Sequence, residues 1–376
     1  MADIQGTWDK KFEGVATTLS KSLDEGTDVG ASVVVMVHGN PVVDIWGGFT
    51  DEAKTTPWQE DTLINVWSTT KTMTFLSALM LADRGQLDFH APVAEYWPEF
   101  AAAGKDRVEV RHLMGHTAGL AGWTEHLETE ELADWEKCTS LLAAQEPWWE
   151  PGTASGYHAV TQGYLIGEVV RRITGKSIGT WFAEEVAGPL GADFHIGLPA
   201  SEDHRVAPVI PPPPVDVEAM GLSDYAMRAL ANPILDATWT YNEWWRRAEI
   251  PAANGQGNAR SVATVQSIIA GNGEARGSRL VSEKTLEAVF EEQADGKDLV
   301  LGIPLRFGMG YGLSSETMPL GPRSCFWGGY GGSLILMDQE AGLTVAYVMN
   351  RMESGLVGDF RGAGIATAAL VGLAAD

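Results

Sequence analysis

The chain has 376 residues, and its 26 basic and 50 acidic side chains give a formal net charge of −24 at neutral pH. Such an acidic chain is repelled by phosphate backbones and by anionic lipid headgroups, which argues against nucleic acids and membrane surfaces as partners. Two cysteines, Cys138 and Cys325, are too few for a disulfide framework or a cysteine zinc cluster, and 45% hydrophobic residues are typical of a globular protein with a substantial core.

The N-terminal segment MADIQGTWDKKFEG has no apolar stretch of the kind found in a signal peptide. No segment approaches the roughly 18 uninterrupted apolar residues that a membrane-spanning helix needs. We therefore expect a cytoplasmic protein.

The first elements are predicted by the spacing of apolar residues. A helix is predicted at the start, because one apolar face collects Trp8, Phe12, Val15, Leu19 and Leu23. Two β-branched runs follow on either side of His38–Pro41, whose Gly and Asn favour a hairpin turn. A strongly apolar helix is predicted from Ser68 to about Asp83.

The second half contains a connector, a block of strands and a closing helix. Prolines lack an amide hydrogen, so Pro208–Pro214 is predicted to be extended rather than part of a helix or central strand. A strand-rich block covers residues 323–350, with its turn at Asp338–Gly342, and the apolar tail after Gly355 is predicted to be a helix packed on a sheet.

This order of elements predicts an α+β fold with an antiparallel sheet formed by both termini and flanked by helices. A mainly helical domain is inserted between them. We predict that residues 1–95 and 255–376 form the sheet domain and that residues 96–254 form the inserted domain over the active site.

The first sign of a catalytic site is Ser68-Thr69-Thr70-Lys71, a Ser-x-x-Lys sequence at the start of the predicted helix that suits nucleophilic catalysis. One helical turn separates the serine from the lysine, so the amine lies on the same face within reach of the hydroxyl. The free amides of the helix N-terminus favour a developing oxyanion, and burial lowers the pKa of the lysine. By itself the motif is more typical of a serine that caps a helix and is followed by an exposed lysine.

His112 and His116 lie four residues apart, as metal ligands on a helix do. The zincin motif requires Glu after the first His, and Leu113 stands there. Structural hydrogen bonding is therefore the better interpretation, and neither a metal nor an organic cofactor is expected.

The Ser-x-x-Lys sequence lies in the first of four ordered blocks, and together these blocks resemble the serine β-lactamase/penicillin-binding-protein superfamily. The resemblance is to its class C-like branch, which includes the family VIII carboxylesterases, and it spans nearly the whole chain. The blocks are Trp67–Lys71, Leu113–Leu120, Tyr157–Tyr164 and Trp327–Ser333.

The resemblance implies roles for single residues. Ser68 would be the acylated nucleophile, Lys71 its activating partner, and Tyr157 the tyrosine of the family's Tyr-x-Asn element. A tyrosine beside a cationic lysine is pushed toward phenolate, so the two would titrate as a coupled pair, and the sequence leaves open which one takes the first proton. The amides of Ser68 and Tyr330 would form the oxyanion hole.

Two departures from the family pattern bear on the substrate. Trp327-Gly328-Gly329 stands where β-lactamases and D,D-peptidases carry Lys-Thr/Ser-Gly, so the cation that meets a substrate carboxylate is missing. Ala159 replaces the asparagine of Tyr-x-Asn. Both changes favour neutral, apolar acyl esters over β-lactams and peptides.

The inserted region is rich in tryptophan, and part of this aromatic set is predicted to line an apolar pocket. For any single member, packing inside the helical domain is the alternative. The predicted substrate-binding residues are Trp123, His158, Trp327, Gly328, Gly329 and Tyr330.

These observations predict a carboxylesterase that cleaves short-chain or compact acyl esters through an acyl-enzyme on Ser68. The alternatives are a β-lactamase or D,D-peptidase, an acyltransferase of the same fold, and a catalytically silent scaffold. The expected partner is a small-molecule ester, and the sequence is compatible with a homo-oligomer.

Overall fold

The centre of the fold is an antiparallel sheet to which both ends of the chain contribute. The computed structural model describes residues 2–214, 222–234 and 236–375. In this part of the chain the sheet has nine strands in the order β1-β3-β2-β13-β12-β11-β10-β9-β8. The strands are β1 (Ile4–Trp8), β2 (Gly30–Val37), β3 (Asn40–Gly48), β8 (Ala294–Lys297), β9 (Pro304–Phe307), β10 (Gly312–Leu313), β11 (Ser324–Gly328), β12 (Leu334–Asp338) and β13 (Leu343–Met349).

The predicted hairpin forms β2 and β3, with Val37 opposite Asn40. The turn places His38 and Gly39 at φ 48° and 74°, a left-handed conformation that glycine adopts without strain. The other edge of β2 pairs with β13, where Val33 lies opposite Tyr347, so β2 is a central strand and is buried along nearly all its length. This pairing joins the first and last parts of the chain, as predicted.

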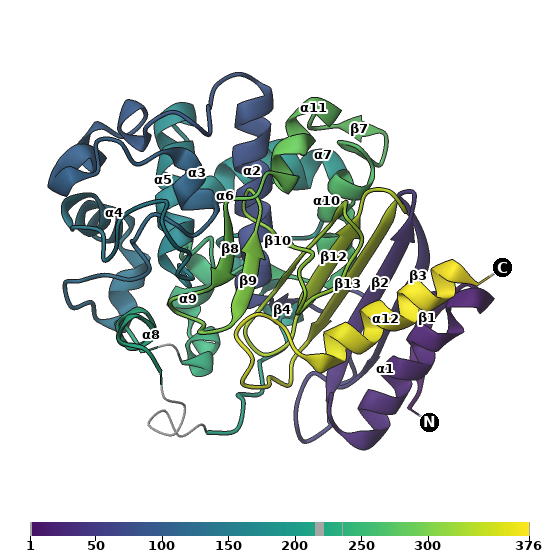
Figure 1. Ribbon diagram of the computed structural model, residues 1–376. Helices are drawn as coiled ribbons and strands as arrows, with labels where there is room; N and C mark the ends of the chain where they lie inside the picture. The colour runs from purple at the N-terminus through teal and green to yellow at the C-terminus, as the bar shows by residue number, and fades with distance from the viewer. Residues whose placement is uncertain (1, 215–221, 235, 376) are drawn as a thin grey trace.

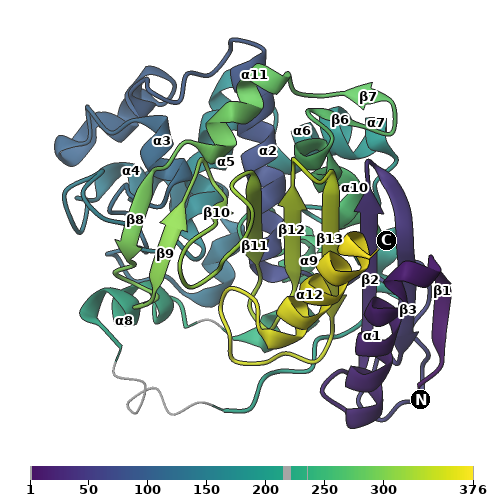
Figure 2. The same ribbon diagram turned by 45° about the vertical axis from the view of Figure 1, so that its right-hand side comes forward.

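Two helices from the chain ends, α1 (Glu13–Glu25) and α12 (Phe360–Ala374), lie side by side on one face of the sheet (Figure 1). On the opposite face α10 (Ala259–Ala270) packs against β2, β12 and β13 (Figure 2). Phe12, Val15, Leu19 and Leu23 are buried as predicted. Trp8 was assigned wrongly to the opening helix: it ends strand β1, which pairs with β3, and its side chain is 39% exposed.

The mainly helical part lies beside the sheet, at the end where β8 and β9 form its edge (Figures 1 and 2). Helix α2 (Thr70–Asp83) contacts α5 (Thr161–Thr174) of this part and also α10, so it lies between the two. The remaining α-helices are α3 (Val110–Met114), α4 (Trp135–Ala144), α6 (Ile178–Phe182), α7 (Gly188–Leu190), α8 (Asp224–Leu230), α9 (Glu243–Arg247) and α11 (Glu283–Leu286). The boundaries at residues 95/96 and 254/255 remain a prediction.

The α+β class and the sheet built from both termini are confirmed. The strands β8, β9 and β10 were not predicted, because they are short and their sequences do not alternate between apolar and polar residues. Residues 208–214 contain no helix, and Ile210 forms a single bridge to Arg351. None of the described helices combines the length and the apolar character needed to cross a bilayer.

Candidate active site

Ser68 lies where a short connection turns into the central helix. The preceding strand β4 (Ile64–Asn65) pairs with β5 (Gln256–Gly257), and Trp67–Thr69 form a 3-10 turn that leads into α2. Trp67 has φ 49°, a strained conformation for a bulky residue, and its ring contacts those of Trp245 and Tyr330. This sharp turn presents the hydroxyl of Ser68 at the N-terminal end of α2.

Lys71 is the buried partner of the serine. Its Nζ lies 3.0 Å from Ser68 Oγ, 2.6 Å from the carbonyl oxygen of Ala159 and 2.9 Å from that of Ala252. Complete burial holds the pKa of Lys71 well below its usual range. As a neutral amine, Lys71 can donate its two hydrogens to the carbonyls, and its lone pair then faces the serine hydroxyl.

Tyr157 approaches the same serine from the irregular segment before α5. Its hydroxyl donates to Ser68 Oγ at 2.7 Å, and its ring lies 4.8 Å from Lys71 Nζ. Ser68 is 7% exposed, whereas Lys71 and Tyr157 are 0% and 1% exposed, so the serine is the least buried of the three.

The two pKa shifts run in opposite directions. Burial raises the pKa of Tyr157, and the nearby charge of Asp298 adds to this, while the hydrogen bond to Ser68 partly offsets it. The sequence-based expectation that the lysine pushes this tyrosine toward phenolate is therefore wrong. The expectation assumed that the charge of the lysine dominates, whereas burial disfavours the charged form of both groups.

Two backbone amides near the serine are free to bind an oxyanion. Among the described residues, neither the amide of Ser68 nor that of Tyr330 donates a hydrogen bond. Gly329 holds the two segments close together: a Cβ atom at this position would lie 3.3 Å from the Ser68 nitrogen and 2.5 Å from the Val66 carbonyl oxygen. Ser333, the last residue of the Trp327–Ser333 block and not one of the predicted site residues, joins them further by donating to Val66 O at 2.9 Å.

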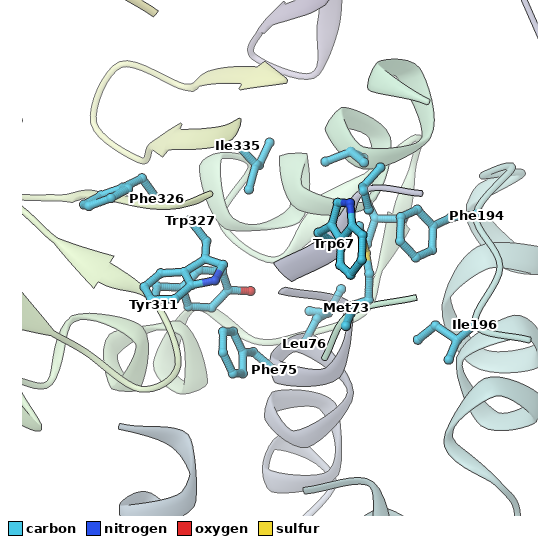
Figure 3. Close-up of a cluster of buried hydrophobic side chains, with 14 of the residues drawn as sticks. Trp67, Met73, Phe75, Leu76, Phe194, Ile196, Tyr311, Phe326, Trp327 and Ile335 are labelled. Atoms are coloured by element: carbon cyan, nitrogen blue, oxygen red, sulfur yellow. The ribbon is translucent and has the colours of Figure 1, made fainter. Parts of the chain in front are cut away.

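Trp327 is buried beneath the site rather than open to it. Its indole stacks on His116 at 5.8 Å and also contacts the rings of Tyr157 and Phe307. Figure 3 shows Trp327 beside Tyr311, with Phe75 of α2 close by. Trp327 is 1% exposed, and among Ser68, Lys71 and Tyr157 it contacts the ring of Tyr157.

Three other predicted substrate-binding residues are not brought to the serine. Trp123 is buried in the helical part, where its Nε1 donates to the carbonyl of Cys138 and its ring contacts Tyr164. His158 is fully buried, and both ring nitrogens are bonded to backbone groups, of Gly156 and Leu120. A Cβ atom on Gly328 would point at Val357, away from Ser68, so none of the three offers surface to a ligand.

The two histidines considered as metal ligands do not share a helix face. His112 lies in α3, and its Nδ1 accepts from the amide of Glu109. His116 follows the end of that helix at φ 61°, and its Nδ1 accepts from the amide of His158. No group of three or more metal-binding side chains is found among the residues that the structure describes.

Comparison with known proteins adds the evolutionary relationship. The beta-lactamase family matches residues 15–369. The chain belongs to this family. It is 36% identical over 381 residues to the esterase/beta-lactamase LipL of Mycobacterium tuberculosis. The alignment covers 94% of this chain and 84% of LipL.

Solved structures agree over nearly the whole chain. A family VIII carboxylesterase is 44% identical, with a TM-score of 0.93 and coverage of 98% of this chain and 99% of the other. A penicillin-binding protein homologue from Caulobacter crescentus is 34% identical, with a TM-score of 0.91 and coverage of 98% and 100%. These relationships confirm the predicted family and an enzyme of the carboxylesterase type, a serine hydrolase.

Proposed function

We propose that the protein hydrolyses uncharged, apolar carboxylic esters through a covalent acyl-enzyme on Ser68. One observation carries the proposal: Ser68 Oγ lies 3.0 Å from a buried amine and 2.7 Å from a buried phenol. Two uncommitted amides lie close to the same serine. Nucleophile, base, acid and oxyanion donors are the parts that acyl transfer requires.

In the first step, the neutral amine of Lys71 accepts the proton of the Ser68 hydroxyl while Oγ attacks the ester carbonyl. The lowered pKa of Lys71 favours the neutral amine, which can act as a base, and the raised pKa of Tyr157 keeps the phenol protonated as an acid. The carbonyl oxygen becomes an oxyanion, which accepts hydrogen bonds from the amides of Ser68 and Tyr330.

The intermediate collapses when the carbon–oxygen bond to the alcohol breaks. Tyr157 donates its proton to the leaving alkoxide, so the Lys71/Tyr157 pair has moved one proton from the serine to the released alcohol. Water then attacks the acyl-enzyme with the same pair as base and acid. The products are a carboxylic acid and the free serine.

The surroundings of Tyr330 favour an apolar substrate. A hollow of about 480 Å³ beside this residue is lined mainly by prolines and aliphatic side chains, among them Pro212, Met227 and Leu230. Asp236 is the one charged residue among the described lining residues. Trp327 contributes no cation to bind a substrate carboxylate, so a neutral ester fits this site better than an anionic β-lactam.

A second candidate is β-lactam hydrolysis by the same serine. The name of LipL includes both activities, and this chain covers 84% of that protein. An acyl-enzyme and the same proton transfers would serve an amide ring as well as an ester. The missing cation at Trp327 makes this the weaker candidate.

The test compares the hydrolysis of p-nitrophenyl acetate, butyrate and octanoate with that of a chromogenic cephalosporin. Ser68→Ala is the inactivating variant. Ser77→Ala is the matched control, because Ser77 is a buried serine of α2, the helix that follows Ser68, and its hydroxyl donates to the carbonyl of Met73. We expect ester turnover that vanishes in Ser68→Ala and persists in Ser77→Ala. Dominant cephalosporin cleavage would support the second candidate, and ester turnover that survives in Ser68→Ala would exclude this nucleophile.

A further inference from the structure

The segment that carries Tyr157 has no regular secondary structure, so its position depends on individual hydrogen bonds. Residues 154–158 form neither helix nor strand. The amides of Gly156 and His158 both donate to His116, at 3.0 Å to its carbonyl oxygen and 3.0 Å to its Nδ1. The amide of Tyr157, between these two, donates to the side chain of Asp298 at 3.0 Å.

Asp298 follows strand β8 at the edge of the sheet and is fully buried. Its Oδ1 accepts three backbone N–H groups: the one from Tyr157, and those of Val300 and Leu301 at 2.9 and 2.8 Å. The amide of the next residue, Leu299, donates to the carbonyl of Ser155 at 2.9 Å. Two hydrogen bonds, at Asp298 and Leu299, therefore join the turn formed by residues 298–301 to the segment that carries Tyr157.

A carboxylate in this position costs desolvation energy, which is compensated by charge-assisted hydrogen bonds. Its other oxygen, Oδ2, is buried without a hydrogen-bond partner among the described residues. Because Oδ2 makes no hydrogen bond, replacing this oxygen with another group would cost the turn no hydrogen bond. The turn alone therefore does not require a carboxylate. What the carboxylate adds is a strong acceptor, and a negative charge, under the backbone of Tyr157.

We propose that Asp298 is a positioning residue that holds Tyr157 at hydrogen-bond distance from Ser68 for proton transfer. This inference rests on the proposed role of Tyr157 as the acid. Asp298 does not touch the substrate; it acts through the backbone of the tyrosine. The acid must lie within hydrogen-bond reach of the reacting oxygen, and a misplacement of about 1 Å lowers the rate on the order of 100-fold.

The variants are Asp298→Ala, which removes the acceptor, and Asp298→Asn, which keeps an acceptor oxygen of the same shape and removes the charge. We expect the kcat for p-nitrophenyl butyrate to fall about 10- to 100-fold in Asp298→Ala with little change in KM, and to recover to within about fivefold of wild type in Asp298→Asn. Asp83→Ala is the control. Asp83 also accepts a backbone amide, that of Ser282, but it lies at the far end of α2, about 20 Å from Ser68 along the helix.

A double-mutant cycle with Tyr157→Phe separates positioning from general destabilisation. If Asp298 acts through the tyrosine hydroxyl, Asp298→Ala costs little further activity once that hydroxyl is gone. A loss of the same factor in both backgrounds would overturn the inference, as would a folded Asp298→Ala enzyme with wild-type kcat. Wild-type activity in Tyr157→Phe alone would instead refute the proposed function.

If Asp298→Ala does not fold, Asp298→Glu carries the test. This variant keeps a carboxylate but adds one methylene to the side chain, so the acceptor for the amide of Tyr157 moves. We expect kcat for p-nitrophenyl butyrate to fall in Asp298→Glu and the loss to disappear in the Tyr157→Phe background. A folded Asp298→Glu enzyme with wild-type kcat overturns the inference.

Discussion

The burial of the Lys71 amine predicts how the free energy of unfolding changes with pH. In the folded protein its neighbours are the oxygens of Ser68, Ala159 and Ala252, and desolvation lowers its pKa well below 10.5. In the unfolded chain the same amine is hydrated and binds a proton up to about pH 10.4. Folding therefore releases one proton, and the free energy of unfolding rises with pH between the two pKa values.

Replacing Lys71 with Met removes this proton release. Relative to Lys71→Met, the wild type should gain up to about 1.4 kcal/mol of stability per pH unit as the pH rises from the lowered pKa of the folded state toward that of the unfolded chain. The variant also leaves two carbonyls without a partner, but that cost is the same at every pH and does not affect the slope. Urea unfolding of both proteins at half-unit pH steps measures the difference.

Lys21→Met is the control, because the Lys21 side chain is 71% exposed and hydrated in both states. It should leave the pH slope of the wild type unchanged. Parallel stability curves for wild type and Lys71→Met would mean that Lys71 is protonated in the folded protein. The assignment of Lys71 as the base would then fail.

Three further substitutions test the surroundings of the site. Gly329→Ala would place a Cβ atom 2.3 Å from Ser333 Oγ, so it should push the strand away from Ser68 and lower kcat on the order of 100-fold, with fluorophosphonate labelling of Ser68 slowed in parallel. Trp327→Ala should destabilise the protein by about 3–5 kcal/mol in urea, since it empties a site between His116, Tyr157 and Phe307; a loss below about 1 kcal/mol would contradict the packing described. Arg361→Met should cost about 3–5 kcal/mol because it leaves the buried carboxylate of Asp28 without its cation, and an unchanged melting temperature would refute this.

The sequence was sufficient to predict much of the fold, because the relevant patterns are local. The valine run of β2 and the His38–Gly39 turn predict a hairpin, and the structure contains it. Trp8 was assigned to the wrong element because its spacing from Phe12 suits a helix, whereas pairing with β3 keeps its segment extended. Strands of two to four residues such as β10 are stabilised by their neighbours in the sheet, and a single sequence gives no signal for that.

In the site, too, local contacts could be predicted from the sequence, whereas contacts between distant segments could not. Ser68 and Lys71 are one helical turn apart, so their contact follows from the sequence, while Tyr157 was found by resemblance and its distance to the serine needed the fold. The direction of the two pKa shifts depends on burial, which a motif does not specify. Asp298 lies 141 residues from its partner amide and belongs to no recognised motif, so only the structure places it beneath Tyr157.

The arrangement of the sheet has a consequence for how the protein is made. The proposed nucleophile, Ser68, comes from the first quarter of the chain, and Tyr330, whose amide is the proposed oxyanion donor, lies just after β11, near the end of the chain. Until β13 has been synthesised, the central strand β2 has an unpaired edge, and a nascent chain at that stage has a serine but no complete site. Ester hydrolysis can therefore serve as an assay of chain completion during translation, because a ribosome-bound or truncated product that stops before residue 324 should be catalytically silent.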